Sequence, residues 1–145
     1  MLESKYSDWR PKTMADLEQD DQRVWLAEKL GSCPGIAAGH FEQPNQLAYA
    51  MLLVPKLNSR AGYKVVVAVK SKNSNNYILK VIEHADGAND SGLVISKEAP
   101  GKYSGFDEAK SVRLKLDGLN VEWIEKSSQL YYYSNGRYHQ LQTSD

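Results

Sequence analysis

Residues 63–70 read Tyr-Lys-Val-Val-Val-Ala-Val-Lys, and this stretch decides the fold class. Successive side chains of a β-strand point to opposite faces of its sheet, so Tyr63, Val65, Val67 and Val69 share one face. β-Branched and aromatic residues are also enriched in strands. The stretch therefore predicts a β-strand with an apolar face directed at a core.

Eight further segments have the same character and are separated by short turns. No helix-length pattern lies between them, which argues against parallel βαβ crossovers. Asp117-Gly118 and Asn135-Gly136 favour the type I′ turn of a two-residue hairpin. These features predict an antiparallel β-meander of about eight or nine strands. The additional strands are expected at Ile36–Phe41, Leu47–Val54, Tyr77–Glu83, Leu93–Ser96, Val112–Leu116, Leu119–Ile124, Leu130–Tyr133 and Arg137–Leu141.

The N-terminal part has a different, helical period. Apolar residues recur at roughly helical spacing from Leu17 to Leu30, and Gly31 supplies a stop. Thr13 with Asp16 resembles a capping box, and the acidic pair at 20–21 would divide the segment into two short helices. We expect an α+β fold in which an N-terminal helix, or two short helices, packs on the meander, with Trp25 between helix and sheet. Residues 1–145 form one expected domain, helical over 1–31 and a sheet over 32–145.

Composition narrows the classes of function. The 145 residues are 41% hydrophobic and 25% charged, and the 18 basic residues balance the 18 acidic ones. A non-specific nucleic-acid binder normally has a basic excess, so no nucleic-acid partner is expected. The single cysteine, Cys33, excludes an internal disulfide and a Cys-rich zinc site. No 18-residue apolar run is present, so no membrane insertion is expected. The oligomeric state stays open.

No known catalytic motif occurs in the chain: there is no nucleophile elbow, P-loop, zincin motif or dinucleotide fingerprint. The three histidines are scattered without metal-ligand spacing. Residues 86–90 superficially resemble a calcium loop, but the spacing of oxygen ligands fails. We therefore expect no catalytic residue, no metal and no cofactor, and we predict that the protein is not an enzyme.

Three regions compete as the binding surface: the long loop 84–92, the long loop 98–111 and the tyrosine hairpin 131–138. Long loops often carry function, and tyrosine is enriched at interaction surfaces. Strand alternation places Tyr131 and Tyr133 on one face and Tyr132 on the other. The predicted contact residues for a protein partner are Tyr103, Phe106, Asp107, Glu108 and Tyr132.

Residues 33–41 and 47–54 resemble a half-repeat of the FG-GAP or VCBS type. Gly39 and Phe41 match its start, and Tyr49 with Ala50 matches its end. The calcium ligands of that family do not carry over, because Glu42 alone keeps an oxygen ligand. The resemblance thus implies a strand–turn–strand unit without calcium.

A short predicted helix comes before this unit, and the chain ends in the aromatic hairpin Tyr131-Tyr132-Tyr133-Ser134-Asn135-Gly136-Arg137-Tyr138. In this build the whole chain resembles small exported bacterial proteins, some of which are inhibitors or effector-immunity proteins. This resemblance implies a non-catalytic module that neutralises a secreted bacterial enzyme or toxin. The alternative is a ligand- or glycan-binding accessory domain of an exported protein. Residues 2–10 are too polar for a signal peptide. The expected location is periplasmic or secreted, the leader being absent from this chain, with the cytoplasm as the alternative.

Overall fold

The computed structural model describes residues 6–29, 32–57, 62–87 and 89–145. Within these ranges it contains eleven β-strands, one 3-10 helix and one α-helix. The helices are η1 (Met14–Asp16) and α2 (Gln19–Lys29). The strands are β1 (Trp9–Pro11), β2 (Ile36–Gln43), β3 (Gln46–Pro55), β4 (Tyr63–Lys70), β5 (Tyr77–Ala85), β6 (Leu93–Glu98), β7 (Gly101–Ser104), β8 (Ser111–Leu114), β9 (Gly118–Trp123), β10 (Ser127–Ser134) and β11 (Arg137–Ser144).

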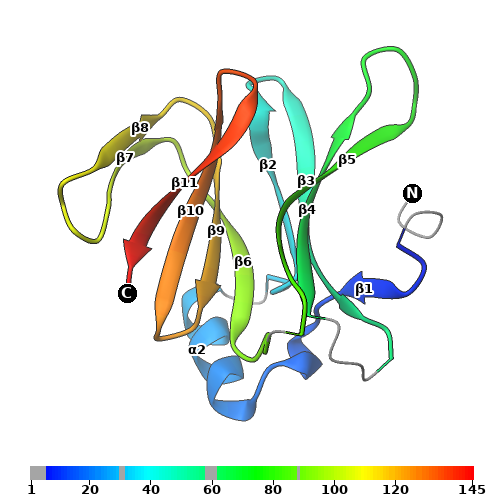
Figure 1. Cartoon of the computed structure of the whole chain (residues 1–145), viewed down its shortest axis with the longest axis vertical. Coiled ribbons are helices and arrows are strands. Elements are labelled where there is room, and N and C mark those ends of the chain that lie inside the picture. Colours follow the sequence, from blue (N-terminus) through cyan, green and yellow to red (C-terminus); the bar gives the residue numbers. More distant parts are fainter. Residues whose placement is uncertain (1–5, 30–31, 58–61, 88) are drawn as a thin grey trace.

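Two antiparallel sheets face each other (Figure 1). In the first sheet β3, β4 and β5 are neighbours, while β1 and β2 pair with successive parts of the outer edge of β3. The second sheet has the strand order β11-β10-β9-β6, and β7 pairs with β8 alone. The mostly β, antiparallel part of the predicted fold is therefore confirmed.

The main core fills the space between the two sheets. Val65 and Val67 of β4 are buried there against the inward faces of β6 and β9, which include Ile95 and Val121. The opposite face of β4 is also buried, because Val66 packs in a second cluster with Tyr6. A central strand covered on both faces is apolar throughout, which explains the near-continuous valine run.

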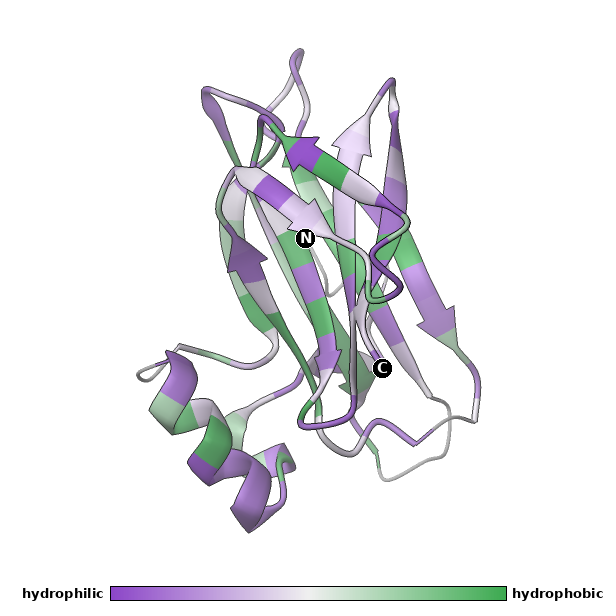
Figure 2. Cartoon of the chain, turned by 90° about the vertical axis from the view of Figure 1, so that its left-hand side faces the viewer, coloured by the Kyte–Doolittle hydropathy of each residue, from purple (hydrophilic) through white to green (hydrophobic). Residues whose placement is uncertain are grey.

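The outer face of the second sheet is covered by two elements. Helix α2 places Trp25, only 1% exposed, against Val94 of β6 and Ile124. The indole Nε1 donates to the main-chain oxygen of Ser32 at 2.7 Å. Figure 2 shows hydrophobic residues interspersed with hydrophilic ones along this helix. The prediction that Trp25 lies between helix and sheet is confirmed, and the β7–β8 hairpin covers the remainder of this face.

The details of the N-terminal prediction are wrong in three respects. Thr13 and Asp16 do form a reciprocal cap, but it belongs to η1 and not to the α-helix. The α-helix begins at Gln19, so the acidic pair 20–21 forms its first turn and does not divide it. Trp9–Pro11 also pairs with β3, inside the part predicted to be helical. Three residues are too few for an alternating pattern to reveal a strand.

The single meander of eight or nine strands is also wrong. β6 pairs with β9, not with its sequence neighbours, and β8 does not pair with β9 across Asp117-Gly118. Instead the Asp117 carboxylate accepts the main-chain N–H of His40 at 2.8 Å, and Asp117 N–H donates to His40 O at 3.2 Å. These bonds to β2 replace the ones that a hairpin would make. The Asn135-Gly136 hairpin is confirmed, with positive φ at both residues.

Among the described residues, no helix has both the length and the apolar character that crossing a membrane requires.

Candidate functional site

The β7–β8 hairpin brings two of the three predicted surfaces together. Its residues Tyr103, Val112 and Leu114 pack against Leu130 and Leu141 on the outer face of the second sheet. The region predicted as a loop, 98–111, therefore contains a strand and lies directly on the tyrosine hairpin β10–β11 (Figure 1). The two surfaces that the sequence offered as alternatives form one continuous surface.

The tip of this hairpin, residues 105–110, is held by main-chain hydrogen bonds. Gly105 N–H donates to Lys110 O at 2.7 Å, and Glu108 N–H donates to Gly105 O at 2.9 Å. Phe106 N–H donates to Gln142 O of β11 at 2.9 Å, which fastens the tip to the second sheet. Glu108 takes a left-handed conformation with φ 58°. These contacts fix the backbone of the tip and its place against the second sheet.

Among the Phe, Tyr and Trp residues of the described ranges, Phe106 is the one that is exposed, with 54% of its surface accessible. Asp107 and Glu108 beside it are exposed as well. The Asp107 carboxylate accepts the N–H of Ala109 at 3.2 Å, so it also shapes the turn. The tip thus presents an apolar ring bordered by negative charge.

Tyr103 has a different place from the other predicted contact residues. Its ring is half-buried in the cluster that seats the hairpin. Its hydroxyl donates to Ala99 O at 2.6 Å and lies 3.5 Å from Glu98 Oε2, and burial raises the pKa of this phenol. The geometry makes Tyr103 a residue that positions the hairpin beneath the exposed tip.

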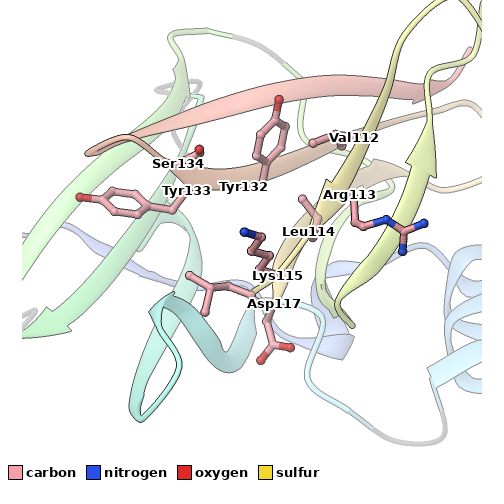
Figure 3. A pocket seen from close by; sticks show the side chains of 9 residues that line it. Val112, Arg113, Leu114, Lys115, Asp117, Tyr132, Tyr133 and Ser134 are labelled. Carbon is pink, nitrogen blue, oxygen red and sulfur yellow. The ribbon is translucent and has the colours of Figure 1, made fainter.

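Tyr132 faces outward from β10, whereas Tyr131 faces the core between the sheets. The ring of Tyr132 stacks on that of His139, with the two ring centroids 5.3 Å apart. Tyr132 also lines a cavity of about 290 Å³ between residues 112–117 and the end of β10 (Figure 3). A second hollow of about 270 Å³ lies beside the tip, where Phe106 and Lys110 meet residues of β10 and β11.

Two carboxylates missed by the sequence reasoning lie between the sheets. Glu83 accepts hydrogen bonds from the hydroxyls of Tyr63, at 2.9 Å, and Tyr131. Glu42 accepts one from Tyr138 at 2.6 Å and is 2.8 Å from the ammonium of Lys80. Burial is the main cause of the raised pKa values of the three phenols. Each carboxylate joins strands of the first sheet to tyrosines of the second, and strand alternation alone gives no sign of such pairing.

In loop 84–92, the third predicted surface, Asp90 contacts a buried lysine. The ammonium of the fully buried Lys12 donates to Asp90 O and lies 3.2 Å from the Asp90 carboxylate. Ala88 falls outside the described residues. Sequence reasoning missed Lys12, since a lysine between proline and threonine carries no sign of burial.

No family model matches this chain, and no curated protein or solved structure is significantly similar to it. The resemblance to the FG-GAP or VCBS half-repeat, and to small exported proteins, therefore rests on the quoted residues alone. β2 and β3 do form an antiparallel pair with a tight connection between Gln43 and Gln46.

Proposed function

We propose that this chain is a non-catalytic protein-binding module that inserts the tip of its β7–β8 hairpin into a partner. The observation that carries the proposal is the exposed ring of Phe106, alone in this among the Phe, Tyr and Trp residues of the described ranges, on a backbone fixed by hydrogen bonds. Interfaces are dominated by a few aromatic anchors near their centre, so a fixed exposed ring is the expected form of such an anchor.

The apolar area that Phe106 exposes is large enough for an anchor role. A phenylalanine side chain contributes about 150–250 Å² on burial, so the exposed half corresponds to roughly 100 Å². At about 25 cal/mol per Å², covering it stabilises a complex by roughly 2–3 kcal/mol. The carboxylates of Asp107 and Glu108 add a preference for a partner pocket with a basic rim, because complementary charge steers encounter and excludes wrong partners.

The partner class follows from the sequence resemblance to inhibitors and immunity proteins. We propose a secreted bacterial enzyme or toxin, met in the periplasm or outside the cell, whose cleft the tip occludes. Occlusion needs a rigid sheet that presents a loop and needs no catalytic group. Tyr132 lies on β10, where it packs with the buried side of this hairpin, and so stays outside the proposed tip contact.

The test is affinity capture with the folded chain from an extract of exported proteins, followed by binding and activity titrations with the purified partner. Phe106→Ala should weaken binding at least about tenfold and leave the urea midpoint unchanged. Ile78→Ala is the matched control, because Ile78 is 52% exposed but lies on β5 of the other sheet. The wild-type chain should abolish the partner's activity at one equivalent.

Equal binding by the wild type and Phe106→Ala would refute the role of the tip. A captured partner that stays fully active when saturated would refute inhibition while leaving the binding module intact. A larger loss for Ile78→Ala than for Phe106→Ala would move the interface to the first sheet.

A further inference from the structure

The cavity of about 290 Å³ beneath the hairpin lies in a fork between two strands. β9 and β10 are paired only as far as Leu119 and Tyr131. Beyond that pair, the residues that precede β9 turn away from β10. They do so because the carboxylate and the N–H of Asp117 are hydrogen-bonded to the main chain of His40 in β2. Residues 112–117 therefore form one wall of the fork and residues 132–134 form the other (Figure 3).

The wall formed by β10 presents free main-chain groups to this space. The two-residue turn at Asn135-Gly136 makes Ser134 and Arg137 the hydrogen-bonded closing pair of the hairpin. Hydrogen-bonded pairs alternate along an antiparallel ladder, so the N–H and C=O of Tyr133 point away from β11. They point toward the side on which β9 would lie if it continued. On that side no described strand pairs with Tyr133.

The opposite wall has a free edge as well. Over the described ranges, β8 pairs with β7 and with no other strand. The cavity is lined by consecutive residues 112–117 and by no residue of β7, so it lies along the unpaired side of β8. Two strand edges with unpaired main-chain groups thus border the same space.

A single cation is aimed into the fork. Figure 3 shows the ammonium of Lys115 in the centre of the lining residues, whereas the guanidinium of Arg113 points away from them. Among the described residues no carboxylate lies within ion-pair distance of Lys115. The ring of Tyr132 and the side chain of Leu114 supply an apolar surface beside this charge.

We propose that this fork binds an extended peptide segment of a partner protein as an added β-strand, with an acidic side chain of that segment paired to Lys115. In strand addition the main-chain hydrogen bonds supply affinity, and side-chain contacts supply the choice of sequence. The site is separate from the tip and does not depend on the proposed function. The free strand edges favour a peptide over a sugar. A sugar would contact the ring of Tyr132 and the ammonium of Lys115 but would leave those edges unpaired.

The probe is a phage-displayed library of random octapeptides selected on the intact chain. The selected sequences should alternate apolar and acidic residues. A capped synthetic copy of the strongest sequence should lose about threefold to fivefold in affinity for Lys115→Gln, the size of an exposed ion pair. Lys102→Gln is the matched control, since Lys102 is an exposed lysine of β7 outside the cavity, and it should bind unchanged.

Main-chain recognition is tested with the same peptide N-methylated at alternate residues. Each of the two N-methylated registers should lose about fivefold or more, because alternate N–H groups of the peptide pair with the two edges and each lost hydrogen bond costs on the order of 1 kcal/mol. Phe106→Ala should bind the unmodified peptide normally, which separates this site from the tip. Selection of no peptide, selection without acidic residues, or binding of both N-methylated registers as tight as that of the unmodified peptide would overturn the proposal. Binding of trigalacturonate in place of any peptide would overturn it in favour of an acidic glycan.

Discussion

Replacement of the buried Lys12 by alanine or methionine separates the roles of its stem and its charge. The side chain is fully buried, and its ammonium contacts the main-chain oxygen and the carboxylate of Asp90. Lys12→Ala removes three buried methylene groups beyond Cβ, at about 0.8 kcal/mol each. It also removes a hydrogen bond from a charged donor, which contributes about 1.5–3 kcal/mol. The expected loss at neutral pH is therefore about 4–5 kcal/mol.

Lys12→Met keeps most of the stem and removes the charge. Replacing a buried ion by an apolar side chain of similar volume is often neutral or stabilising. The carboxylate of Asp90 is partly exposed, so water can solvate it after the change. We expect Lys12→Met to change the free energy of unfolding by less than about 1.5 kcal/mol at pH 7.

The two variants also differ from the wild type in pH dependence. Burial is the main cause that lowers the pKa of Lys12 in the folded chain, while the unfolded chain keeps a value near 10.4. Between these two pKa values the unfolded state binds more protons, so the contribution of Lys12 to stability rises with pH in that window. The free energy of unfolding of the wild type, minus that of Lys12→Met, should therefore increase with pH through this window. The increase should be complete by about pH 10.4.

The assay is urea unfolding followed by tryptophan fluorescence from pH 7 to pH 10.5. A methionine variant as unstable as the alanine variant at pH 7 would show that the charge is needed. A difference between the wild type and Lys12→Met that stays constant with pH would refute the lowered pKa.

Three further changes test other parts of the fold. Trp25→Ala should lower the free energy of unfolding in urea by about 3–5 kcal/mol, whereas Leu26→Ala, at its exposed neighbour, should change it by less than about 1 kcal/mol. Equal losses for the two variants would contradict the packing of α2. The Arg10 guanidinium holds the pKa of Asp16 well below its usual range; Asp16→Asn should cost about 1 kcal/mol at pH 7, and calorimetry should show that cost fading as the pH falls below about 4. Burial raises the pKa of the Tyr131 phenol, so wild-type stability should fall above about pH 10, and an equally steep fall in Tyr131→Phe would count against this assignment.

Much of the secondary structure could be predicted, because alternation and turn chemistry are local. The valine run of β4 and the Asn135-Gly136 turn lie where the pattern places them. Pairing partners could not be predicted, because a strand's own sequence does not specify its neighbour. The hydrogen bonds between Asp117 and His40, which open the fork, join residues far apart in the chain.

The sequence could suggest individual residues of the candidate site but not their arrangement. Phe106, Asp107 and Glu108 are exposed together at the tip, as a glycine-bounded loop suggests. Tyr103 and Phe106 share the same local chemistry, yet one ring is packed and the other is exposed. That difference depends on the outer face of β10 and β11, which the hairpin covers.

Site-specific photocrosslinking tests the central claim, the role of the tip, most directly. A photoreactive phenylalanine analogue is placed at Phe106 in one sample and at Ile78, the exposed control on β5, in another. After irradiation in an extract of exported proteins, position 106 should give one discrete adduct, suppressed by excess wild type but not by excess Phe106→Ala. Adducts of equal yield at both positions, or at position 78 alone, would contradict the account.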